Sequence, residues 1–172
     1  EQALDPKVAY VSLSMLEGVC KPAADYGYYP TAWRAHVLNR PCGGKTGTTN
    51  DSRDAWFCGF TPEFTAVVWV GYRDNRSLGH GADYTGGRLA CPIWVSFMEQ
   101  VHEGLGVEDF KVPPGIEFFD IDRKSGTRGG KYKEAYVQGT APPLYTPPPP
   151  PAEDQGIMPE EAEEDIPLLL AL

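Results

Sequence analysis

Hydrophobic residues recur at helical spacing in two parts of the chain. In residues 5–20 they form one broad face, with Asp5 as a suitable N-cap and Pro6 in the first turn. In residues 89–102 they recur at every fourth position, namely at Leu89, Ile93, Phe97 and Val101. Both segments are therefore predicted to be amphipathic helices, and we expect each to pack its apolar face against a sheet.

Shorter apolar segments, bounded by turn residues, predict three strands between these helices. They cover residues 41–49, 54–60 and 64–72, and the turns between them favour an antiparallel meander. The third strand contains the continuous apolar run Val-Val-Trp-Val, which is typical of a central strand covered on both faces. Trp56 and Trp69 are accordingly expected in the core. Together the elements predict an α/β fold of the α+β type, an antiparallel sheet with packed helices.

The C-terminal part of the 172-residue chain differs in composition. A small β extension is predicted for residues 107–140, with a short strand at 116–122. Residues 141–172 combine proline runs with acidic clusters, which predicts a disordered tail. Residues 134–172 contain eight acidic and no basic residues, and so account for most of the net charge of −9. Residues 1–106 form the main predicted domain, and the absence of a basic patch argues against nucleic-acid binding.

The first predicted strand carries the candidate chemistry. The ammonium of Lys45 supplies positive potential, and the hydroxyls of Thr46 and Thr48 can donate to a carboxylate. Gly47 lets a peptide lie close to the backbone. The set suits a substrate that ends in a carboxylate. A phosphate-binding loop is excluded, because it would need a glycine in place of Asn39 and a helix after the lysine and threonine.

Lys-Thr-Gly is also one of the three motifs of the penicillin-interacting serine enzymes, and its neighbours match that group. The matching segments are Gly-Gly-Lys-Thr-Gly-Thr-Thr-Asn-Asp at 43–51, Asp-Ala-Trp-Phe at 54–57, Val-Trp-Val-Gly-Tyr at 68–72, Thr-Gly-Gly-Arg at 85–88 and Ala-Cys-Pro-Ile-Trp at 90–94. With them the chain resembles the class A penicillin-binding proteins, which join a glycosyltransferase domain to a transpeptidase domain. The resemblance covers most of the chain except residues 21–38 and the last thirty.

The resemblance implies the C-terminal portion of a penicillin-binding/β-lactamase-like transpeptidase fold, and peptidoglycan D,D-transpeptidation through an acyl-enzyme. By the same resemblance, Lys45, Thr46 and Thr48 are catalytic positions, and these three with Gly47 bind substrate. The implied partners of the parent protein are peptidoglycan stem peptides, the lipid-linked precursor and β-lactams, with no cofactor. The implied location is the periplasm, at the outer face of the bacterial cytoplasmic membrane. A membrane anchor is expected outside this sequence, which has no apolar stretch of the ~20 residues that a span needs.

Two motifs of the resembled family are missing. No serine is followed three residues later by lysine, and none is followed two residues later by asparagine. We therefore expect a C-terminal piece of a transpeptidase that is inactive alone. Two alternatives are a non-catalytic penicillin-binding-like module and a β-lactamase-type serine hydrolase. The Asp-Ala-Trp-Phe and Pro-Ile-Trp segments and the long extension argue against the hydrolase.

Other polar residues do not predict a metal site. The three histidines, His36, His80 and His102, lack ligand spacing. Asp120 and Asp122 do not fit a calcium loop, because the positions after them lack the required glycine and glutamate. The chain has four cysteines, Cys20, Cys42, Cys58 and Cys91, which are expected to be small buried hydrophobic residues. Whether Cys42 and Cys58 form a disulfide is left open by the sequence.

The segment at 21–40 departs from the resemblance and is rich in aromatic residues. It is expected to be a variable surface loop, with a short helix at 32–38. A role in shaping the wall of a substrate groove is the alternative. Residues 73–87 are polar and glycine-rich and are expected to form a solvated connecting loop.

Overall fold

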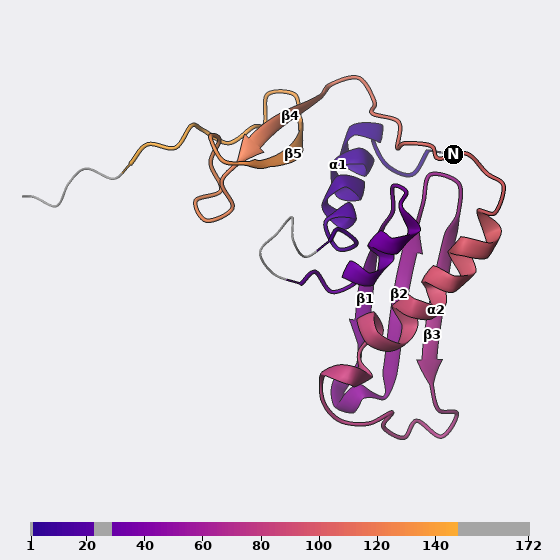
Figure 1. Ribbon diagram of the computed structural model, residues 1–172. Helices are drawn as coiled ribbons and strands as arrows, with labels where there is room; N and C mark the ends of the chain where they lie inside the picture. Colours follow the sequence, from indigo (N-terminus) through magenta and orange to yellow (C-terminus); the bar gives the residue numbers. More distant parts are fainter. Residues whose placement is uncertain (1, 23–28, 148–172) are drawn as a thin grey trace, which may run out of the picture.

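The computed structural model describes residues 2–22 and 29–147 of the chain (Figure 1). It contains two α-helices and five strands, with three short 3-10 turns between them. In chain order these are α1 (Pro6–Glu17), η2 (Trp33–Leu38), β1 (Gly43–Thr48), η3 (Asn50–Ser52), β2 (Asp54–Phe60), β3 (Thr65–Gly71), η4 (Ala82–Tyr84), α2 (Gly86–Val101), β4 (Ile116–Ile121) and β5 (Tyr132–Val137).

The first three strands form an antiparallel sheet in the order β1-β2-β3. Its register pairs Thr46 with Phe57, and Trp56 with both Gly47 and Trp69. The predicted antiparallel meander is confirmed. The expectation that residues 64–72 form a central strand is wrong, because β3 lies at one edge of the described sheet.

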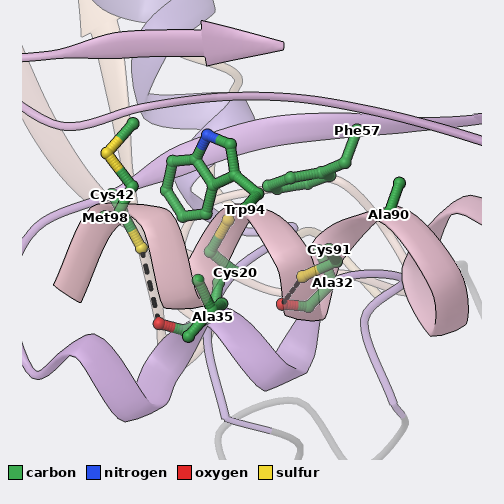
Figure 2. Packing of buried hydrophobic residues seen from close by; sticks show 10 residues of the cluster. Cys20, Ala32, Ala35, Cys42, Phe57, Ala90, Cys91, Trp94 and Met98 are labelled. Carbon is green, nitrogen blue, oxygen red and sulfur yellow. Dashed lines mark hydrogen bonds between the residues drawn. The ribbon is translucent and has the colours of Figure 1, made fainter. Parts of the chain in front are cut away.

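Helix α2 covers one face of this sheet, where the core lies (Figure 1). The ring of Phe57 meets that of Trp94 edge-to-face at 5.1 Å, and both side chains are fully buried (Figure 2). Gly59 makes this contact possible, since a Cβ there would lie 2.6 Å from both rings. Met98 and Cys91 complete the set of large, fully buried side chains.

The opposite face of the sheet is open in the described structure. Trp56 is 40% exposed, Trp69 46% and Val67 56%. The two indoles lie 6.1 Å apart, and Trp69 Nε1 donates to Asp54 Oδ1 at 2.9 Å. The expectation that both tryptophans belong to the core is therefore wrong. The apolar run of β3 was misleading because no described element covers its second face.

Helix α1 begins as predicted, with Pro6 in its first turn and the Lys7 N–H donating to the Asp5 side chain at 2.8 Å. It contacts β1 and β5 (Figure 1). None of its residues is fully buried, and Val8 and Met15 remain 50% and 70% exposed. The helix thus packs against strands as expected, but it is not the core helix that its wide apolar stripe would suggest.

The C-terminal strands β4 and β5 form a separate antiparallel pair, in which Ile116 faces Val137. This agrees with the strand predicted in the extension. In the connection between β4 and β5, the Arg128 N–H donates to Pro143 O at 2.9 Å, and the Tyr145 N–H donates to Arg128 O at 3.3 Å. The first residues of the predicted tail thus pair with the extension, while residues 148–172 lie outside the described part of the chain.

Neither α1 nor α2 is long and apolar enough to cross a membrane, and the same holds for every other helix in residues 2–22 and 29–147. Helix α2 starts three residues before the predicted boundary, at Gly86. Both Gly86 and Gly87 are buried. A Cβ on Gly86 would lie 2.2 Å from Trp56 O, so glycine allows the helix to begin directly against the sheet.

Candidate functional site

The four predicted site residues lie on β1, whose strand geometry sends alternate side chains to opposite faces of the sheet. Lys45 stands opposite the exposed Cys58, on the open face. Thr46 stands opposite the buried Phe57, on the face that carries α2. Thr48 follows Thr46 by two residues and points the same way. The strand thus separates the lysine from the two hydroxyls.

Lys45 is exposed, and its Nζ donates to Thr46 O at 2.6 Å. The side chain therefore folds along the edge of its own strand. The sequence prediction placed the ammonium and the hydroxyls around one carboxylate. In the structure they reach a ligand from different sides of the strand, so they can share one only at the edge of β1.

Thr48 connects the strand to the start of α2. Its Oγ1 accepts a hydrogen bond from the Gly86 N–H at 3.1 Å. The hydroxyl proton of Thr48 is left to donate elsewhere. This bond also satisfies one of the N–H groups that a helix leaves unpaired in its first turn.

Gly47 faces a neighbour within the sheet. It pairs with Trp56, and a Cβ at this position would lie 3.3 Å from the Cβ of Trp56. That approach is tight for an added side chain. The glycine thus gives room to the tryptophan, in addition to the close peptide approach that the sequence suggested.

A cavity of about 620 Å³ opens beside the two threonines. It lies between β1, the start of α2 and the segment that precedes β1. Its walls are formed by Tyr29, Pro30, Thr31, Trp33, Arg34, Thr46, Thr48, Ala82, Thr85, Gly87 and Arg88. The aromatic composition of residues 21–40 was the signal for this wall. The structure places residues 29–34 of that segment at the wall of a cavity, and their role in a substrate groove stays a prediction.

Sequence reasoning missed the two arginines of the cavity. The Cζ atom of Arg34 lies 4.7 Å from the centre of the Trp33 ring. Arg88 pairs with Asp83 at 3.5 Å, and both side chains are largely exposed. Among the residues that the structure describes, none that lines the cavity is acidic. The hydroxyls of β1 therefore face a space with two arginines, one of which is paired with Asp83.

The outer edge of β1 is also accessible. Within the described residues β1 pairs only with β2, so its other side presents backbone N–H and C=O groups without a strand partner. Helix α1 comes close to the start of this strand, where Glu17 N would lie 3.1 Å from a Cβ on Gly43. An extended peptide could therefore lie along the rest of the edge.

His102 and the four cysteines do not line this cavity. His102 is buried, with Nδ1 2.7 Å from Met98 O and Nε2 3.0 Å from Thr61 Oγ1. Residues 2–22 and 29–147 hold no group of three or more potential metal ligands. The possible disulfide between Cys42 and Cys58 is not formed, because Cys58 faces Lys45 on the open side while Cys42 lies in the core.

Comparison with known proteins agrees with the motif. No family model matches the chain, but the chain is homologous to part of a class A penicillin-binding protein. Penicillin-binding protein 1A of Escherichia coli is 42% identical over 133 residues, which cover 67% of this chain and 16% of that protein. The same-named protein of Vibrio cholerae is 39% identical over 142 residues, covering 72% and 17%.

A solved structure gives the same result. The crystal structure of penicillin-binding protein 1A from Haemophilus influenzae superposes with a TM-score of 0.70 at 32% identity, covering 83% of this chain and 22% of that one. The chain thus spans less than a quarter of the proteins that it resembles. It is related to a part of penicillin-binding protein 1A, and the structural match covers most of the chain.

Proposed function

We propose that this chain supplies the substrate-binding strand of a peptidoglycan D,D-transpeptidase of the class A penicillin-binding type. The observation that supports this most directly is the position of Thr46 and Thr48. Their hydroxyls face a cavity whose described lining contains two arginines and no acidic residue, in a chain homologous to penicillin-binding protein 1A. Such a site suits a peptide that ends in a carboxylate.

In the proposed reaction, a serine carried by the parent protein outside this sequence attacks the D-alanyl-D-alanine amide. The terminal D-alanine leaves, and the acyl-enzyme passes its acyl group to the amine of a neighbouring stem peptide. Thr46 and Thr48 donate hydrogen bonds to the terminal carboxylate, and the Thr48 N–H serves as one oxyanion donor. Lys45 adds positive potential across the strand edge, and Gly47 allows close approach of the peptide.

The parent protein would carry a glycosyltransferase domain upstream and would use the lipid-linked precursor as well as stem peptides. It would act in the periplasm, at the outer face of the cytoplasmic membrane of a bacterium, and β-lactams would acylate its serine. The free edge of β1 supports this assignment, because an extended peptide or its β-lactam mimic can hydrogen-bond to an unpaired strand.

The proposal is tested by Thr46→Val and Thr46→Ser in the full-length parent. Valine keeps the shape and removes the hydroxyl, so acylation by benzylpenicillin should slow about ten- to a hundredfold, the effect of losing a charge-assisted hydrogen bond. Serine keeps the donor and should lose much less. Thr65→Val, on the exposed end of β3, makes the same change away from the site and should acylate at the parental rate.

Two results would overturn the assignment. Parental acylation of Thr46→Val together with slow acylation of Thr46→Ser would show that the hydroxyl is not the donor. The second test uses this chain alone, incubated with a fluorescent penicillin and denatured. Because it contains no Ser-x-x-Lys motif, we expect no covalent label, and a stoichiometric labelled band would contradict the proposal.

A further inference from the structure

Two residues close the end of β1, where the chain turns into β2. The Thr49 N–H donates to Asp54 O at 3.1 Å, and the Asp54 N–H donates to Thr49 Oγ1 at 2.8 Å. The Thr49 hydroxyl in turn donates to Asp54 Oδ2 at 3.1 Å. This hydroxyl thus spends both its proton and a lone pair on one residue, and the turn at 50–53 is tied together at its base.

The second carboxylate oxygen of Asp54 reaches a different strand. Its Oδ1 accepts a hydrogen bond from Trp69 Nε1, on β3, at 2.9 Å. Asp54 is itself the first residue of β2, so its side chain joins the end of β1 to both other strands of the sheet. A carboxylate can accept from two donors through separate oxygens, whereas an amide has a single oxygen that accepts. The two donors therefore favour an acid over an amide at this position.

These contacts determine where the Thr48 N–H points. Along an antiparallel pair, the N–H groups of one strand point alternately to the partner strand and away from it. The Thr49 N–H points to β2, since it donates to Asp54 O. The N–H of Thr48, the residue before it, therefore points to the free edge of β1. Thr49 and Asp54 form the last hydrogen-bonded pair before the turn, and the ends of strands open more readily than their middles.

The Thr48 hydroxyl is held by a different neighbour. Its Oγ1 accepts a hydrogen bond from the Gly86 N–H at 3.1 Å, a contact in which Asp54 takes no part. Loss of the Asp54 carboxylate would therefore loosen the direction of the Thr48 N–H and keep the anchor of the hydroxyl. The two roles proposed for Thr48, one for its side chain and one for its backbone, thus depend on different contacts.

We propose that Asp54 is a positioning residue that fixes the direction of the Thr48 N–H through Thr49. This inference rests on the proposed function, in which that N–H stabilises the oxyanion. An oxyanion donor is effective because it is aimed at the developing charge before the reaction begins. In this proposal Asp54 does not touch the substrate, and it acts through the backbone at the end of β1.

The test measures acylation of the full-length parent by benzylpenicillin, with the dissociation constant and the acylation rate constant determined separately. Asp54→Asn should lower the rate constant about tenfold, a part of the roughly hundred- to thousandfold loss that follows removal of an oxyanion donor. The dissociation constant should stay at the parental value, because the hydroxyls of Thr46 and Thr48 are kept. A residue that only stabilises the fold would not separate the two constants in this way.

The partner of the Asp54 carboxylate provides the second set of variants. Thr49→Val should slow acylation as Asp54→Asn does, and Thr49→Ser should be close to the parent because it keeps the hydroxyl. The double variant should be no slower than the slower single variant, because both changes break the same contact. Thr49→Val decides the question if Asp54→Asn does not fold.

Asp74→Asn is the matched control. The Asp74 carboxylate also accepts a backbone hydrogen bond, from the Arg76 N–H at 3.4 Å, but it lies in the loop after β3. The same change there should leave both constants unaltered. A parental rate constant in both Asp54→Asn and Thr49→Val, or equal losses in Thr49→Ser and Thr49→Val, would overturn the role of Asp54, while Thr46→Val still tests the proposed function by itself. A parent that benzylpenicillin does not acylate would overturn both.

Discussion

The two faces of the three-stranded sheet are built from the same strands and differ sharply in burial. On β2, Ala55 and Phe57 are fully buried under α2, whereas Trp56, which lies between them, is 40% exposed. Cys58, the next residue, is also exposed. Local sequence is thus not what distinguishes the faces. The difference comes from the element that covers each face, and only one face has such an element in the described structure.

This difference divides the candidate site as well. Thr46 and Thr48 lie on the covered face, where the Gly86 N–H and the start of α2 fix the position of Thr48. Lys45 lies on the open face and donates a hydrogen bond to the backbone of its own strand. The hydroxyls are therefore positioned by the core, while the lysine is free to adjust to what approaches the edge.

The largest expected effect compares one tryptophan from each face. Trp94→Ala removes a fully buried ring packed on Phe57 and should lower the free energy of unfolding by about 3–5 kcal/mol. Trp56→Ala should lower it by only about 0.5–1.5 kcal/mol, since it loses an exposed ring pair with Trp69. Urea denaturation of both variants measures the two losses. Equal losses would show that the open face is covered in solution.

The second prediction concerns the close approach of α2 to the sheet. A Cβ on Gly86 would lie 2.2 Å from Trp56 O and 2.7 Å from Gly47 O. Gly86→Ala should therefore push the helix away from β1 and destabilise the chain by about 1–3 kcal/mol. Gly106→Ala, where no atom lies within 4 Å of the added Cβ, is the control and should be nearly neutral. A stable Gly86→Ala chain with an unchanged cavity would contradict the packing.

The reactivity of the cysteine thiols gives another test of the difference between the two faces of the sheet. Burial raises the pKa of Cys91 to about 12, and the hydrogen bond to Cys42, with burial, raises that of Cys20. At pH 8 a disulfide reagent should modify Cys58 rapidly and the core thiols only after unfolding. Rapid modification of two or more thiols in the folded chain would refute this. Cys58→Ser is the control and should abolish the fast phase.

The raised pKa of Cys91 also determines how the stability of the fold changes with pH. The folded state holds the proton above the ordinary pKa of 9.0, where the unfolded state releases it. This contribution is complete below pH 9 and should be lost as pH rises towards 12. Between pH 9 and pH 12, the free energy of unfolding of Cys91→Ala should fall less steeply with pH than that of the parent chain. Identical slopes would contradict the shift.

The smallest effect is expected at the far end of the covered face. Glu63 lies in the turn after β2, 3.2 Å from His102 Nε2 and 3.5 Å from Arg40 Nη1. Although burial alone would raise the pKa of Glu63, hydrogen bonds from Thr61 and His102 lower it below the ordinary value of 4.5. This stabilisation is present above pH 4.5 and should be lost as pH falls below it.

Glu63→Gln should lower the free energy of unfolding by about 0.5–1 kcal/mol at neutral pH, as expected for a partly exposed ion pair. It should also make the stability depend less on pH in the acid range. Glu99→Gln, on the solvent side of α2, is the matched control and should leave acid unfolding unchanged. Parental acid unfolding of Glu63→Gln would show that the turn does not hold the helix end.

The sequence predicted the strands and α2 well because alternation and fourfold spacing are local properties. It could not predict which faces are covered. The apolar run around Trp69 looks the same whether its second face meets a helix or is open. Helix α1 shows the same limit, since Met15 lies on a clear apolar stripe and is 70% exposed.

Part of the candidate site followed from the motif, because Lys-Thr-Gly has a recognisable chemistry. Arg34 and Arg88 did not follow from it. Both arginines are brought to the cavity beside Thr46 only by the fold, because Arg34 lies 12 residues before and Arg88 42 residues after Thr46 in the chain. The aromatic character of residues 21–40 indicated a wall, but no spacing rule links an arginine there to a strand further along the chain.

The unpaired edge of β1 also affects the solubility of the chain. An open strand edge offers the same hydrogen bonds to another copy as to a peptide, and so it can start edge-to-edge aggregation. Lys45 lies along this edge with its ammonium at the backbone, and two such edges brought together would confront like charges. The lysine would then keep molecules apart as well as attract substrate, and neutralising it should first be noticed as a loss of solubility.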